Sequence, residues 1–135
     1  MRILKPERSL FFNPQVREIL NREADKRAVE ELTSEKPMER VEAVERLLEV
    51  VNDDKLKKEL TIIVTVAKKE EFLKKIEKEE AKVDNMTKEK AAKYEKLISG
   101  YTAAKTKSAE DIENLAMQRT MSDSELQQKL KKVLA

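Results

Sequence analysis

The apolar residues between positions 54 and 83 recur at intervals of three, four and seven, the spacing of an amphipathic helix. They are Leu56, Leu60, Ile63 and Ala67, continued with a slight rotation by Val66, Leu73, Ile76 and Val83. At ~1.5 Å per residue, a helix over this range is roughly 45 Å long, which exceeds the length of a typical globular helix. We expect the other elements to pack around it.

The middle of this segment, residues 60–67, is rich in β-branched residues, which favour strands over helices. Taken alone it could be a buried strand, but it has no second strand-like segment to pair with. Asp53 can cap a helix that begins at Asp54, and the Lys/Glu-rich continuation contains neither proline nor glycine. We therefore predict one continuous helix over 54–83 whose β-branched middle is enclosed by its neighbours.

Two shorter helices are expected before the central one. Asn13-Pro14 is a strong start signal, because asparagine caps free backbone N–H groups and proline suits the first helical position; this helix should end near Thr33. Pro37 opens the second helix, which should end near Val51. The expected inward positions are Val16, Ile19, Leu20, Ala24, Ala28 and Leu32, then Met38, Val41, Val44, Leu47, Leu48 and Val51.

Residues 84–87 form the next break, and a fourth helix is expected from Lys88 to Ser99. Gly100, the only glycine, stands where a helix C-cap favours a residue with positive φ. If the break does not turn the chain, the third and fourth helices form one very long rod. Both arrangements remain open.

The last third of the chain contains two capping boxes, a weaker one from Ser108 to Asp111 and a standard one from Ser122 to Glu125. They predict two short helices and hence a C-terminal helical hairpin over residues 108–135. Its apolar spacing resembles that of a helix-turn-helix. However, Thr120 replaces the usual turn glycine, and Lys129 stands where an apolar residue is expected, so a plain hairpin closing the bundle is favoured.

Residues 1–13, bracketed by Pro6 and Pro14, are predicted to be an extended arm. The most hydrophobic part of this arm consists of Leu10, Phe11 and Phe12, which follow the basic residues Arg2, Lys5 and Arg8. The two phenylalanines can pack on the chain's own helices as a hydrophobic staple. Alternatively, they anchor a neighbouring subunit, or the basic residues contact nucleic acid.

Composition narrows the class of protein. Of 135 residues, 41% are charged and only 4% are aromatic, so the core must be aliphatic and thin, with helices that carry long solvated faces. The length suits a single domain, here residues 14–135. The longest apolar run is far shorter than the ~20 residues of a membrane span, and no signal peptide is apparent, so a soluble chain without a membrane partner is expected.

The residue types needed for most catalysis are missing. Histidine and cysteine are both absent, which removes the commonest general base, the usual metal ligand and all thiolate chemistry. One glycine cannot build a Gly-rich phosphate loop. Glu70, Glu77 and Glu80 alternate with lysines in the manner of a salt-bridged surface. We predict no catalytic residue, no metal, no cofactor and no small-molecule substrate.

Residues 85–107 form the most basic window, with six lysines against two glutamates. The lysines are Lys88, Lys90, Lys93, Lys96, Lys105 and Lys107, and Tyr94 and Tyr101 lie among them. Such a window can meet a phosphate backbone through charge and stacking, and lysine without arginine suits nonspecific contact. Alternatively, it is a solubilising face that pairs with the acidic segment 35–54, including that of another copy.

We therefore expect an all-α bundle of five to six helices around one long central helix, with an extended N-terminal arm, assembling as a homo- or hetero-oligomer. This layout is similar, in architecture only, to helical coat proteins of filamentous viruses. It favours a non-enzymatic structural protein that self-assembles and contacts nucleic acid nonspecifically, of nucleoprotein or virion coat type. The alternatives are an adaptor, chaperone or scaffold that acts through exposed helical faces, and a DNA-binding regulator that uses the C-terminal hairpin.

Overall fold

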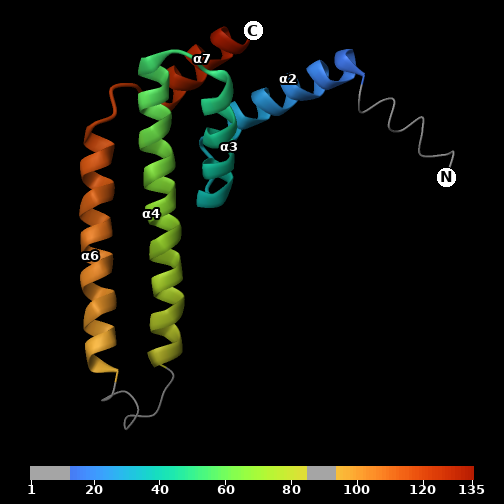
Figure 1. Cartoon of the computed structure of the whole chain (residues 1–135). Helices are drawn as coiled ribbons and strands as arrows, with labels where there is room; N and C mark the ends of the chain where they lie inside the picture. Colours follow the sequence, from blue (N-terminus) through green and yellow to red (C-terminus); the bar gives the residue numbers. More distant parts are fainter. Residues whose placement is uncertain (1–12, 85–93) are drawn as a thin grey trace, which may run out of the picture.

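The computed structural model describes residues 13–84 and 94–135, which form five α-helices and no strand (Figure 1). In chain order the helices are α2 (Pro14–Glu31), α3 (Pro37–Val50), α4 (Asp54–Asp84), α6 (Glu95–Met117) and α7 (Asp123–Leu134). The expected all-α bundle around one long helix is confirmed. Residues 1–12 of the predicted arm lie outside the described residues.

The longest element is α4, with 31 residues, and it packs against α3, α6 and α7. It begins as predicted, because Asp53 Oδ1 accepts the backbone N–H groups of Lys55 and Leu56 at 2.9 and 3.1 Å. Its β-branched middle is helical: Ile62 and Ile63 are buried, whereas Val64 and Val66 are half-buried. Packing from several sides therefore outweighs the local strand preference of this segment.

One hydrophobic core joins α2, α3, the first half of α4, and α7; we call this part the head. Its buried residues are Ala28, Val29, Leu32, Ala43, Val44, Leu47, Val51, Leu56, Leu60, Ile63, Leu126 and Leu130. Hydrogen bonds also join these helices. Between α7 and α2, Gln127 Nε2 donates to the Val29 carbonyl at 2.9 Å, and between α3 and α2, Arg46 Nε donates to Asp25 at 2.8 Å. As predicted, Ser122 caps α7, its hydroxyl accepting the Glu125 N–H at 3.1 Å.

Beyond the head, α6 runs antiparallel beside α4, so the two helices form a hairpin rather than one rod (Figure 1). Two ion pairs cross it, Lys69 Nζ to Asp111 at 3.1 Å and Lys105 Nζ to Glu80 at 2.9 Å. The chain therefore turns between the third and fourth helices, which resolves the alternative left open by the sequence.

Two predictions about the C-terminal third are wrong. Gly100 lies inside α6 without a positive φ and caps nothing, because a single glycine costs a helix only ~1 kcal/mol. Ser108 is buried in the interior of α6 and does not start a short helix. As a result, α7 packs against α2 and α4 instead of lying alongside a short partner helix.

Some apolar residues predicted to face inward are exposed. Ile19 and Leu20 are 60% and 52% exposed, and Met38 at the start of α3 is exposed as well. The first half of α2 extends away from the body of the molecule (Figure 1). Helical spacing identifies an apolar face, but it does not reveal whether another element of the same chain covers that face.

Candidate functional site

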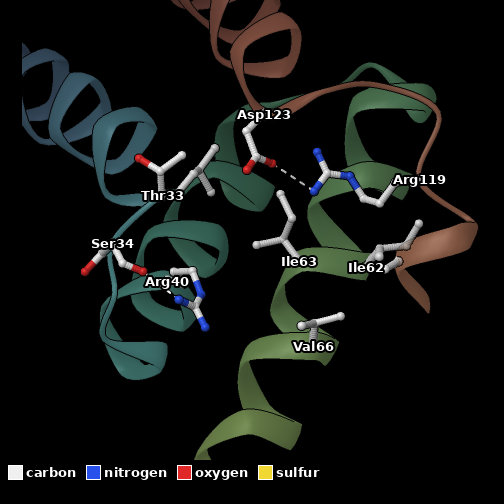
Figure 2. A pocket seen from close by; sticks show the side chains of 10 residues that line it. Thr33, Ser34, Arg40, Ile62, Ile63, Val66, Arg119 and Asp123 are labelled. Carbon is white, nitrogen blue, oxygen red and sulfur yellow. Dashed lines mark hydrogen bonds and ion pairs between the residues drawn. The ribbon is translucent and has the colours of Figure 1, made fainter. Parts of the chain in front are cut away.

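A cavity of about 260 Å³ lies where the end of α2 meets α3, α4 and the turn between α6 and α7 (Figure 2). Its apolar wall comes from the middle of α4, and its polar rim from the other three segments. The lining residues are Leu32, Thr33, Ser34, Arg40, Ile62, Ile63, Val66, Ala116, Arg119 and Asp123. An apolar wall with converging polar groups is the usual form of a small-molecule site, so its charges decide its role.

Both arginines at this cavity are occupied by groups of the protein itself. Arg40 donates to the Ser34 carbonyl at 2.6 Å and to the Glu70 carboxylate. Arg119 contacts Asp123 at 3.0 Å and donates to the Met121 carbonyl at 3.1 Å. A guanidinium whose N–H groups already bond to protein acceptors offers little free charge to a ligand. We therefore interpret the cavity as a gap where the helices pack together and not as a ligand site.

Arg119 also contacts Glu59, whose side chain is only 2% exposed. The Glu59 carboxylate accepts Arg119 Nε at 2.8 Å, the N–H and hydroxyl of Thr120 at 2.7 Å each, and the Met121 N–H at 2.9 Å. Burial alone would raise the pKa of Glu59. The hydrogen bonds from Thr120 and Met121 and the Arg119 charge outweigh burial, so this pKa lies below its ordinary value of 4.5.

Glu59 is therefore ionised at neutral pH and has no proton to donate, which makes it an anchor for the turn rather than an acid catalyst. The sequence did contain a signal for it. Leu56, Glu59, Leu60 and Ile63 follow the i, i+3, i+4, i+7 pattern of a buried helix face. Glu59 occupies an apolar position of that pattern, and a carboxylate there requires buried partners.

The three described lysines of the predicted basic window, Lys96, Lys105 and Lys107, do not form one cluster. Lys105 is neutralised by Glu80, whereas Lys96 and Lys107 are exposed and about 16 Å apart along α6. Tyr94 is exposed and Tyr101 half-buried. The remaining predicted contact residues lie outside the described residues; they are Lys88, Lys90, Lys93, Arg2, Lys5, Arg8 and the apolar anchor Leu10, Phe11 and Phe12.

A second group of lysines, not anticipated from the sequence, borders two adjoining hollows of about 430 and 360 Å³ between α4 and α7. We call it the lysine hollow: Lys55 and Lys58 on α4, and Lys129 and Lys132 on α7. The two pairs are more than seventy positions apart in the chain. Only the packing of α7 against α4 brings them together.

The first half of α2 presents an uncovered apolar surface, which we call the α2 outer face: Val16, Ile19 and Leu20. Val16 is half-buried and the other two are exposed. With ~100° of rotation per residue, Ile19 lies on the opposite side of the helix from Ala28, which enters the core, whereas Leu20 lies about 80° from Ala28. The exposure of Ile19 and Leu20 shows that the head does not cover this face.

Comparisons with known protein families, with curated proteins and with solved structures find no match for this chain. In the part of the chain that the structure describes, no three acidic side chains are grouped so as to hold a metal ion. Nor is any described helix both long and apolar enough to cross a membrane. Two surface features of the described residues are candidates for function, the α2 outer face and the lysine hollow.

Proposed function

We propose that this chain is a non-enzymatic helical structural protein that self-assembles and contacts nucleic acid without sequence preference, in the manner of a nucleoprotein or virion coat subunit. The observation that carries the proposal is the α2 outer face. Between Asn13 and Glu23 every residue except Val16 is exposed, so the described residues give this part of the helix little support beyond the hydrogen bonds from Arg46 to Asn21.

An unsupported helix of this length is marginal in water, because nucleation is costly and the cap at Asn13 contributes only ~1 kcal/mol. Ile19 and Leu20 are both more than half exposed, so covering each would contribute about 1–2 kcal/mol. If another chain covers this helix, packing contacts stabilise its helical conformation, and the apolar surface of Ile19 and Leu20 is removed from water.

The occupant we propose is the same face of a second copy. Arg22 pairs with Glu18 and Lys26 with Glu23 along α2, so a copy of the helix meets a surface of mixed charge rather than of one sign. Pairing of like faces gives a two-fold dimer, the commonest form of homo-oligomer. Leu10, Phe11 and Phe12 precede this face directly in the sequence and would extend the same apolar contact.

Light scattering on the purified chain tests the assembly. The wild-type protein should have at least twice the 15.7 kDa mass of one chain, and the double variant Ile19→Glu, Leu20→Glu should return to that mass. The matched control is Met117→Glu, because Met117 is 77% exposed at the C-terminal end of α6 and lies outside the face. A monomeric wild type, or a variant of unchanged mass, would overturn the assembly proposal.

Nucleic-acid binding is tested separately by titrating labelled DNA of several sequences at a series of salt concentrations. Binding should weaken steeply with salt and differ little between sequences. An adaptor would not bind at moderate salt, and a regulator would prefer one sequence. Either result would contradict the proposal.

A further inference from the structure

The four residues of the lysine hollow form two rows. Lys55 and Lys58 are three residues apart on α4, as are Lys129 and Lys132 on α7, so the two lysines of each row lie on the same side of their helix. Both rows belong to the end of the molecule opposite the far end of the α4–α6 hairpin (Figure 1). Two rows of cations thus border one shallow surface.

The acidic residues at this surface cancel only part of the lysine charge. Two carboxylates share the lining, those of Asp53 and Glu125. Asp53 accepts two backbone N–H groups at the start of α4, and Glu125 neutralises Lys129, with which it pairs at 3.3 Å. None of the ion pairs between described residues involves Lys55, Lys58 or Lys132.

This chemistry suits a phosphate chain better than a single small anion. All four lysines are exposed, so each remains hydrated and interacts weakly with one ion. A polymer of phosphates gains by contacting several such charges at once and by releasing its own counterions. Lysine lacks the planar fork of arginine that reads base edges in pairs, so the contact carries no sequence preference.

We infer that the lysine hollow is a site where this chain contacts the nucleic-acid backbone. The inference rests on the proposed function and assigns its nucleic-acid contact to one site. The α2 outer face lies on a different helix and remains free for a second copy. One subunit can therefore contact nucleic acid and its neighbour at the same time.

The test compares charge-neutralising variants of the full chain, using fluorescence anisotropy of a labelled 30-nucleotide single-stranded DNA. Each lysine that contacts a phosphate adds ~0.7 to the slope of log K against log salt. The double variant Lys58→Gln, Lys132→Gln should therefore lower the slope by about 1.4 and weaken binding roughly ten-fold near 0.15 M salt. Circular dichroism and light scattering should be unchanged, since both side chains are exposed.

Two other double variants remove the same charge elsewhere. Lys74→Gln, Lys75→Gln changes exposed lysines of α4 outside the hollow and should alter binding less than about three-fold, because only long-range charge is lost. Lys96→Gln, Lys107→Gln tests the competing basic window and should behave like that control.

Equal binding by the wild type and the Lys58/Lys132 variant would overturn the assignment, as would a larger loss in the Lys96/Lys107 variant. A wild type that binds no DNA even at ~50 mM salt would instead refute the nucleic-acid part of the proposed function. Vesicles containing phosphatidylserine serve as a second polyanion. If these vesicles, and not DNA, bind through the same lysines, the hollow faces a lipid surface and the assignment is wrong.

Discussion

Replacing Glu59 with alanine should destabilise the head more than any surface substitution, because one buried carboxylate holds the whole turn between α6 and α7. The change removes the acceptor of four hydrogen bonds, from Arg119, from the N–H and hydroxyl of Thr120, and from the Met121 N–H. Breaking a buried charge pair on one side costs about 3–5 kcal/mol, since the remaining charge is left uncompensated. Arg119 retains Asp123 and the Met121 carbonyl, which favours the lower half of this range.

The assay is urea unfolding at pH 7 followed by circular dichroism, with the free energy of unfolding extrapolated to water. A loss of about 3–4 kcal/mol is a large share of the 5–15 kcal/mol typical of a native domain. The matched control is Glu79→Ala, which removes only an exposed ion pair with Lys82 and should cost less than ~0.5 kcal/mol. If Glu59→Ala stays within about 1 kcal/mol of the wild type, Glu59 does not anchor the turn as described.

The remaining predictions concern pH, α6 and the core. Because the pKa of Glu59 is lowered in the folded protein, its contribution to the free energy of unfolding is complete above its ordinary pKa of 4.5 and declines as the pH falls below that value. Urea titrations at a series of pH values should therefore show the difference in unfolding free energy between the wild type and Glu59→Ala becoming smaller below pH 4.5. Gly100→Ala should raise the free energy of unfolding by about 0.5–1 kcal/mol, because a Cβ at this helical position meets nothing within 4 Å; a loss of stability would contradict its placement in α6. Leu126→Ala, in the fully buried part of α7, should cost about 2.7–5 kcal/mol in the same assay, whereas the exposed Val133→Ala should cost less than about 1 kcal/mol.

Local chemistry made the helix starts predictable. Asn13, Asp53 and Ser122 each cap a helix through their own side chain, and such contacts span only two or three residues. The continuity of α4 was also predictable, since its helical spacing extends over thirty residues while its strand-like part covers eight. The prediction of a helix end at Gly100 is wrong because the weak local preference of glycine yields to the contacts that α6 makes along α4.

Features that depend on distant parts of the chain were not predictable in the same way. The lysine hollow requires α7 to fold back onto the start of α4, and nothing near Lys55 or Lys132 in the sequence indicates that contact. The exposure of Ile19 and Leu20 depends on where α3 and α7 end relative to α2. Glu59 was predictable only in part. Its place at an apolar position of the helical pattern indicates burial, but the sequence does not identify its partners Thr120 and Met121.

Self-assembly through the α2 outer face can be tested by one cross-linking measurement, because the natural chain contains no cysteine. A Leu20→Cys variant places a single thiol on that face, and Met117→Cys places one on an exposed site outside it. Under mild oxidation at equal concentration, the Leu20→Cys variant should form a disulfide-linked dimer on a non-reducing gel much faster than the Met117→Cys variant. Equal rates for the two variants, or no dimer from Leu20→Cys, would contradict the account.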